Sequence, residues 1–91
     1  MGMERLSVRF EGRVQGVGFR ATARAIAGRH HVTGWVRNEA DGSVQLEVQG
    51  PRTQIQGFLA TVRNTMSAFI QRESVETINP VEGERAFEVR R

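Results

Sequence analysis

The sequence predicts an α+β domain in which two helices cover one face of an antiparallel sheet. Stretches in which apolar and polar residues alternate, as in half-buried strands, are separated twice by stretches in which apolar residues recur at helical spacing. The resulting order is strand, helix, strand, strand, helix, strand, with a short extra strand at the end. Each strand–helix–strand unit must cross over right-handedly, and this order is typical of the ferredoxin-like α/β plait.

The first half of the chain contains a strand, a helix and a second strand. Residues 5–11 alternate, and this pattern places Arg5 on the polar side of the first strand. A helical run begins near Phe19, and Gly28 or the three residues after it end the helix. Alternation then returns over residues 32–38, which predicts the second strand.

The second half begins with a hairpin and ends with two strands. A turn at residues 39–42 joins the second strand to a third at residues 44–49, and Pro51 lies at the start of the second helix. That helix carries one apolar stripe, formed by Ile55, Phe58, Leu59, Val62 and Met66. Residues 69–78 do not keep one strict alternation, so we expect a strand with a bulge or an irregular face. A short strand follows at residues 87–90.

Length and composition predict one domain, residues 1–91, with one core. No segment has the ~20 consecutive apolar residues that a membrane span needs, and the N-terminal residues lack the apolar core of a signal peptide. We therefore expect a cytoplasmic protein.

Cysteine is absent, and His30 and His31 are adjacent, without the usual spacing of zinc ligands. We expect no metal site and no cofactor.

The formal charge is +3, carried by arginine without any lysine. This charge favours anionic partners but falls short of a nucleic-acid-binding stripe, so most of the arginines are interpreted as a solvated surface. Trp35 could stack on a base if it lay on an exposed sheet face, but no second aromatic residue lies beside it on the same strand. Packing is the favoured interpretation of Trp35, and we expect no nucleic-acid partner.

Between the first strand and the first helix lies a loop that contains Gly12, Gly16 and Gly18. Glycine lets such a loop turn tightly and direct successive backbone N–H groups into one concavity, which suits an anion. The start of the helix near Phe19 would add its free N–H groups, and Arg20 could grip two phosphate or carboxylate oxygens at once. The alternative is a merely structural connection. Neither the Walker motif nor the dinucleotide-binding fingerprint fits these residues.

Two motifs in the chain resemble signatures of the acylphosphatase family. Residues 12–20 read GRVQGVGFR and are similar to the first signature, G-x-V-Q-G-V-x-F-R. Residues 34–38 read GWVRN and, with Gly42, Val44 and Gly50 after them, resemble the second signature. The resemblance covers most of the chain. Ala21-Thr22 departs from the aromatic residue that often follows the first motif in the family, and Glu73 interrupts a strand that is usually apolar.

The resemblance implies hydrolysis of the carboxyl–phosphate bond of small acyl phosphates, without metal or cofactor. It assigns phosphate binding to Arg20 and positioning of the attacking water to Asn38, so these two are the expected catalytic residues. The backbone N–H groups expected to hold the phosphoryl oxygens are those of Gln15, Gly16, Val17, Gly18, Phe19 and Arg20. Inorganic phosphate would be a product and a competitive inhibitor, and we expect a monomer that does not bind membranes.

Two other functions compete with this one. The first is a plait-fold module that binds RNA or an acidic partner through clustered exposed arginines and aromatic residues, which the sequence contains only weakly. The second is a non-catalytic domain like the acylphosphatase-like domain of hydrogenase maturation proteins, which belongs to much longer chains.

Overall fold

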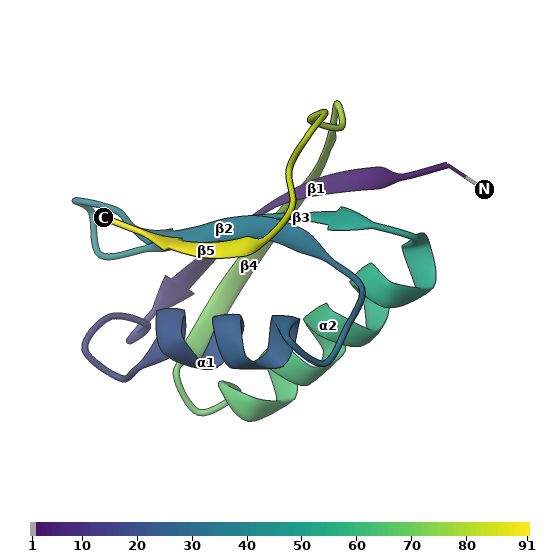
Figure 1. Ribbon diagram of the computed structural model, residues 1–91. Coiled ribbons are helices and arrows are strands. Elements are labelled where there is room, and N and C mark those ends of the chain that lie inside the picture. The colour runs from purple at the N-terminus through teal and green to yellow at the C-terminus, as the bar shows by residue number, and fades with distance from the viewer. Residues whose placement is uncertain (1) are drawn as a thin grey trace.

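The computed structural model describes residues 2–91, which form one sheet and two helices. The elements are β1 (Glu4–Gly12), α1 (Phe19–Ala27), β2 (Thr33–Asn38), β3 (Val44–Gly50), α2 (Arg52–Thr65), β4 (Ile70–Ile78) and β5 (Phe87–Arg90). The strands are ordered β4-β1-β3-β2-β5. Both helices cover the same face of the sheet, and the segment between β4 and β5 passes over the opposite face (Figure 1). The predicted plait, with its extra final strand, is confirmed.

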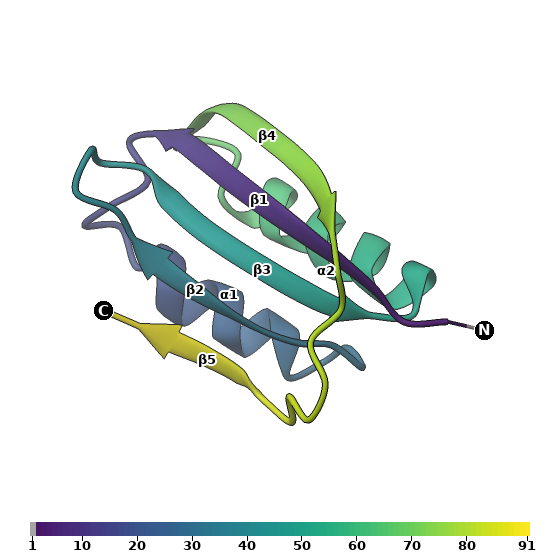
Figure 2. The same cartoon turned by 90° about the horizontal axis from the view of Figure 1, so that it is seen from above.

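The prediction of a wholly antiparallel sheet is wrong at one edge. β5 pairs with β2 in parallel, whereas the other neighbouring strands are antiparallel. The cause is the connection over residues 79–86, which leaves β4 at one edge of the sheet and crosses to the other edge (Figure 2). A strand that returns after such a crossing can run parallel to its neighbour, and alternation alone does not report its direction.

The core lies between the sheet and the helices. Phe10 of β1 is fully buried, with its ring centroid 5.0 Å from that of Phe19 at the start of α1. Phe58 of α2 is fully buried and lies 5.4 Å, between ring centroids, from Phe87 of β5. The predicted stripe of the second helix is buried, including Met66 just beyond its last turn. These contacts fix the start of α1 against β1 and therefore fix the loop between them.

The predicted irregularity of β4 is a bulge close to its start. Glu11 pairs with Arg72, but the next residue, Gly12, pairs with Ile70, so Gln71 has no partner on β1. The bulge lies where β1 ends and the glycine loop begins.

Glu73, which interrupts the apolar pattern of β4, pairs with α2. Nε of Arg63 donates to its two carboxylate oxygens at 2.9 and 2.7 Å. The ion pair explains how a charged residue is accommodated on the helix-covered face of an edge strand.

Arg5 is an exception to the interpretation of most arginines as a solvated surface. Its side chain is only 1% exposed, on the sheet face opposite the helices. The guanidinium donates to Glu47 at 2.9 Å, to Gln49 at 3.0 Å and to Glu84 at 2.8 Å. The Thr33 hydroxyl donates to the same Glu84 oxygen at 2.7 Å. A buried guanidinium needs such partners, and alternation could not predict this set because Glu84 comes from the segment that crosses this face.

The same polar cluster holds the crossing segment, residues 79–86, on the sheet. The Gln49 amide donates to the carbonyl of Val81 at 2.9 Å and accepts from its N–H at 2.7 Å. Gly34 of β2 donates to the carbonyl of Ala86 at 3.1 Å, just before β5 begins. The cluster therefore positions β5 beside β2 and above α1 (Figure 1).

We expect Glu84→Gln to lower the free energy of unfolding by about 1.5–3 kcal/mol at neutral pH, because a hydrogen-bonded carboxylate is lost beside Arg5. Burial opposes ionisation of Glu84, but hydrogen bonds from Arg5 and Thr33 outweigh it and lower the pKa of the carboxyl group. A lowered folded-state pKa contributes stability above the unfolded pKa of ~4.3, and this contribution is lost as the pH falls through the folded pKa. The difference between parent and variant should therefore shrink in acid.

Urea unfolding of both proteins from pH 7 down to pH 3 measures this difference. Glu82→Gln is the matched control, because Glu82 is exposed in the same segment. A Glu84→Gln protein as stable as the parent at pH 7 would contradict the prediction.

Candidate functional site

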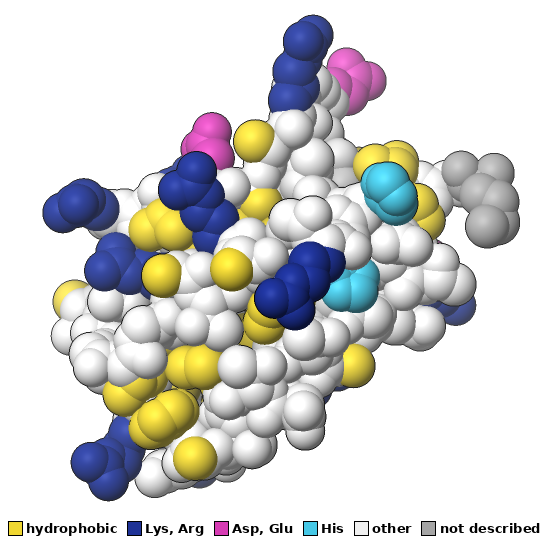
Figure 3. All heavy atoms as spheres, turned by 60° about the horizontal axis from the view of Figure 1, so that its bottom comes forward, with side chains coloured by type: hydrophobic (Ala, Val, Ile, Leu, Met, Phe, Trp, Pro, Cys, Tyr) yellow, Lys and Arg dark blue, Asp and Glu magenta, His cyan; other side chains and the backbone are white. Residues whose placement is uncertain are grey.

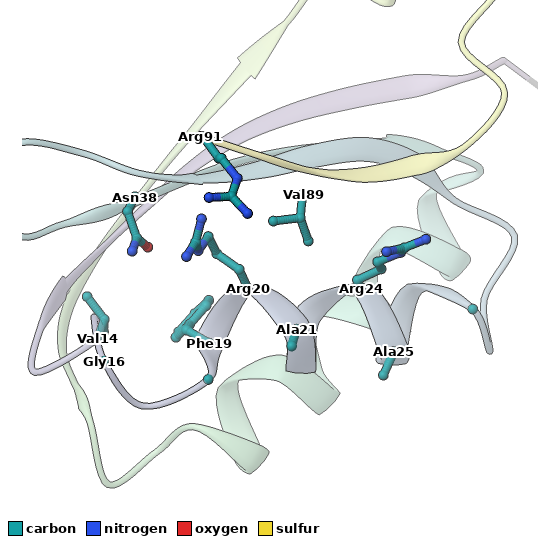
Figure 4. A pocket seen from close by; sticks show the side chains of 12 residues that line it. Val14, Gly16, Phe19, Arg20, Ala21, Arg24, Ala25, Asn38, Val89 and Arg91 are labelled. Atoms are coloured by element: carbon teal, nitrogen blue, oxygen red, sulfur yellow. The ribbon is translucent and has the colours of Figure 1, made fainter.

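The candidate site is a hollow of about 790 Å³ between the glycine loop, one side of α1, the end of β2 and β5 (Figure 4). It is lined by Val14, Gly16, Gly18, Phe19, Arg20, Ala21, Arg24, Ala25, Gly28, Asn38, Val89 and Arg91. Two distant parts of the chain thus bring the predicted pair, Arg20 and Asn38, to one cavity.

The loop reaches the hollow through two glycines in the left-handed region. Gly16 has φ 76° and Gly18 has φ 78°, and Gly18 is the residue directly before α1. Gly12 differs from both, because a Cβ atom there would lie 2.4 Å from the carbonyl oxygen of Phe69. Gly12 therefore allows close approach to the start of β4 and is no part of the hollow.

The backbone donors of this loop are unpaired. Arg13 donates its N–H to the carbonyl of Phe69 at 2.9 Å, and the next backbone N–H that bonds within residues 2–91 is that of Thr22, to the carbonyl of Gly18 at 3.0 Å. The N–H groups of residues 14–21 are left for solvent or a ligand. This segment includes all six residues whose N–H groups were predicted to hold phosphate.

Gln15 has a role that the motif alone did not reveal. Its side-chain amide donates to the carbonyl of Glu39 at 2.7 Å and to that of Ser43 at 2.9 Å. Both acceptors flank the turn between β2 and β3, directly after Asn38. The Gln15 side chain therefore fixes the glycine loop to the end of β2, and with it the spacing between the loop and Asn38.

Arg20 lies in the first turn of α1, where the helix dipole disfavours a cation and favours an anion. The first turn contains no acidic residue. Within residues 2–91 the guanidinium of Arg20 pairs with no carboxylate, and its hydrogen bond goes to the backbone carbonyl of Arg90 at 3.3 Å. The side chain is turned from the helix toward the hollow (Figure 4). An anion in front of the helix would satisfy both Arg20 and the helix terminus.

Asn38 is the last residue of β2, and its half-buried side chain points into the hollow from the side opposite α1 (Figure 4). The turn after it is closed by other groups. Glu39 donates its N–H to the carbonyl of Ser43 at 2.9 Å, and the Asp41 carboxylate accepts from the Ser43 N–H at 3.0 Å and its hydroxyl at 2.6 Å. The turn therefore does not depend on the Asn38 amide, which is left to face the cavity.

The remaining sequence candidates lie elsewhere. His30 packs edge-on against Phe58, with 6.4 Å between ring centroids, and the His31 backbone N–H donates to the Gln54 side chain at 3.0 Å. Trp35 is 7% exposed and lies 4.8 Å from the Arg37 guanidinium and 5.0 Å from that of Arg90, measured from its ring centroid. Its ring is covered and offers no platform for a base.

Sequence reasoning missed the side of the hollow that lies beyond Arg20. Ala21, Arg24 and Ala25 line it from α1, and Val89 and Arg91 line it from β5 and the residue after it. Helical spacing could have placed Arg24 beside Arg20 and Ala25 beside Ala21, since positions four residues apart lie on one face of a helix. The contribution of β5 could not be found without its parallel pairing.

We expect Gly16→Val and Gly18→Val to weaken phosphate binding and to destabilise the fold together. The cost is on the order of 1–3 kcal/mol for a β-branched residue held at positive φ, because relaxing that strain redirects the unpaired N–H groups. No atom lies within 4 Å of a Cβ built at either position, so the effect comes from the backbone conformation.

Gly83→Val is the matched control. Gly83 also has φ 78° and open space around a built Cβ, but it lies in the β4–β5 connection. The melting temperature of each variant is measured at increasing concentrations of inorganic phosphate. The value without phosphate reports stability, and its rise with phosphate reports binding. If the Gly16 or Gly18 variant binds phosphate like Gly83→Val, that glycine does not shape an anion site.

Comparison with known proteins shows the family of this chain. The family model described as acylphosphatase matches residues 6–89. An acylphosphatase from Salinibacter ruber is 43% identical over 89 residues, which are 97% of this chain and 94% of the relative. An acylphosphatase from Geobacillus kaustophilus is 42% identical over 88 residues, which are 96% and 94% of the two chains. The crystal structure of acylphosphatase from Bacillus subtilis superposes with a TM-score of 0.86 at 30% identity, over 97% of this chain and 99% of that one. The resemblance of the two motifs is confirmed, and the chain belongs to the acylphosphatase family.

Proposed function

We propose that the protein hydrolyses small acyl phosphates at this hollow, with Arg20 and Asn38 as its catalytic residues. The observation that carries the proposal is that the Arg20 guanidinium, which pairs with no carboxylate in the described chain, lines one cavity together with Asn38 and with Gly16 and Gly18 of the loop whose N–H groups are unpaired. Fixed donors of this kind suit a phosphoryl group, which carries its negative charge on several oxygens.

In the proposed reaction, the backbone N–H groups of Gln15, Gly16, Val17, Gly18, Phe19 and Arg20 hold the phosphoryl oxygens. The Arg20 guanidinium bridges two of these oxygens and neutralises their charge. The Asn38 amide accepts a hydrogen bond from a water molecule through its oxygen and contacts phosphate through its NH₂ group. Both residues act by positioning and by stabilising charge, which suffices when the leaving group is good.

The water oxygen attacks phosphorus, and the bond between phosphorus and the acyl oxygen breaks with its electron pair on the carboxylate. A phosphoryl oxygen takes the proton of the attacking water, so the products are a carboxylate and inorganic phosphate. This route requires no side chain as general base, and within residues 2–91 no acidic residue or histidine lines the hollow.

The test is release of phosphate from benzoyl phosphate by the purified protein in excess chelator. We expect turnover in chelator, competitive inhibition by inorganic phosphate, and a melting temperature that rises with phosphate occupancy. Turnover without inhibition or stabilisation at saturating phosphate would contradict the anion site, and absence of turnover would contradict the function.

Within residues 2–91 no helix is long and apolar enough to cross a membrane. The cytoplasmic location, the monomeric state and the independence from metal stay predictions. Sedimentation at several protein concentrations would measure the monomeric state, and turnover in chelator measures the independence from metal.

A further inference from the structure

The hollow holds more positive charge than one phosphoryl group requires. Three guanidinium groups line it, those of Arg20, Arg24 and Arg91. Within residues 2–91 none of the three forms an ion pair with a carboxylate. Arginine side chains are spread over this side of the molecule, and acidic side chains lie only at its upper margin in the view of Figure 3. Six arginines outside the hollow are paired with carboxylates, namely Arg5, Arg9, Arg37, Arg52, Arg63 and Arg90, whereas the described chain shows no such pair for Arg13, Arg29, Arg72 and Arg85. What distinguishes Arg20, Arg24 and Arg91 is that they share one cavity.

The three cations fall into two groups along the hollow. Arg20 and Arg91 lie together at the end that faces Asn38, whereas Arg24 lies beyond Val89 at the other end (Figure 4). Arg24 follows Arg20 by four residues on α1, which separates their Cα atoms by ~6 Å along the helix axis. Like charges at this spacing repel each other and destabilise a helix unless anions lie beside them.

The surface between the two groups is apolar and small. Ala21 and Ala25 are exposed on α1, and Val89 is 37% exposed on β5 although its side chain is apolar. All three line the hollow, and Val89 lies between Arg20 and Arg24 in the view of Figure 4. Such a floor accommodates the carbon skeleton of an acyl group whose phosphoryl end is held at Arg20.

We propose that Arg24 is a specificity determinant for acyl phosphates whose acyl group carries a second anion at its far end. The inference rests on the proposed function and adds the substrate class to it. The phosphoryl group occupies the end of the hollow at Arg20, the carbon skeleton lies over Ala21, Ala25 and Val89, and Arg24 pairs with the terminal anion. Arg91 adds to the positive potential at the phosphoryl end.

The test uses two substrates of equal size, 4-carboxybenzoyl phosphate, with an anionic tail, and 4-carbamoylbenzoyl phosphate, with a neutral one. Selectivity is the ratio of their kcat/KM values at low ionic strength. We expect the parent to favour the anionic tail, and Arg24→Gln to lower this selectivity by about three- to tenfold, mostly through KM. Arg24→Lys should retain part of the preference, and added salt should reduce the preference of the parent.

Arg29→Gln is the matched control, because it removes the same charge from an exposed residue just after α1 that does not line the hollow. Its selectivity should equal that of the parent. An equal loss in the Arg24 and Arg29 variants would mean that net charge alone acts, and a parent without preference would also overturn the inference. Both results leave acyl phosphate hydrolysis in place, whereas a parent that hydrolyses neither substrate contradicts the proposed function itself.

Discussion

Arg20→Ala is expected to abolish nearly all turnover and to leave the fold intact. The Arg20 side chain is half-buried beside the hollow, and its hydrogen bond to the carbonyl of Arg90 is a single contact at 3.3 Å. Its loss should therefore cost little stability. A charge-assisted contact to phosphate contributes roughly 1.5–3 kcal/mol to binding, and more when charge shifts in the transition state. Arginines that stabilise phosphoryl transfer elsewhere contribute ~10³-fold or more to kcat, and we expect a loss of this order in kcat/KM.

The measurements are kcat/KM for benzoyl phosphate, the inhibition constant of inorganic phosphate, and the melting temperature with and without phosphate. Arg20→Lys keeps the positive charge but cannot form the bidentate contact of a guanidinium, so it should retain only part of the parental activity. Arg29→Ala, which removes an exposed arginine outside the hollow, should behave like the parent. A folded Arg20→Ala protein with parental kcat/KM would exclude Arg20 from the reaction.

The elements that the sequence predicted well are those whose pattern is set by local geometry. Residues 5–11 and 44–49 alternate because one side of each strand faces the helices, and the stripe of α2 repeats because one side of that helix faces the sheet. The irregularity of β4 could also be predicted, because the bulge at Gln71 interrupts the alternation of apolar and polar residues.

The features that could not be predicted depend on the crossing segment. The burial of Arg5 requires Glu84, which lies 79 positions away and reaches the cluster only because residues 79–86 cross the sheet. The parallel pairing of β5 has the same origin, and so does the contribution of Val89 and Arg91 to the hollow. No local pattern encodes a contact over this separation.

The site residues could be predicted from the sequence for a different reason. Arg20 and Asn38 follow from a resemblance in two motifs, whereas the three glycines alone were compatible with either an anion site or a merely structural connection. The different roles of the glycines could not be predicted, because the sequence alone does not distinguish Gly12 from Gly16. The structure distinguishes them, because a Cβ built at Gly12 would lie 2.4 Å from the carbonyl oxygen of Phe69, whereas Gly16 lines the hollow.

Asn38→Ala is expected to lower kcat by roughly 10²-fold or more and to leave phosphate affinity largely in place, because a preorganised polar group acts mainly in the transition state. Asn38→Asp should lose as much rate and also bind phosphate more weakly, since it places a negative charge beside the phosphoryl group. Measuring kcat, phosphate inhibition and melting temperature on both variants distinguishes an enzyme from a mere phosphate binder.

The competing explanation is that Asn38 only shapes the turn at residues 39–42, so that its loss would reduce stability and leave turnover per folded molecule unchanged. The turn is closed by the bonds between Glu39 and Ser43 and by the Asp41 carboxylate, and none of these involves the Asn38 side chain. Asp41→Ala is therefore the control for turn damage, with a lower melting temperature and near-parental kcat. If Asn38→Ala follows Asp41→Ala in both measurements, Asn38 does not position the attacking water; if it keeps its melting temperature and loses kcat, the amide acts on the reacting atoms.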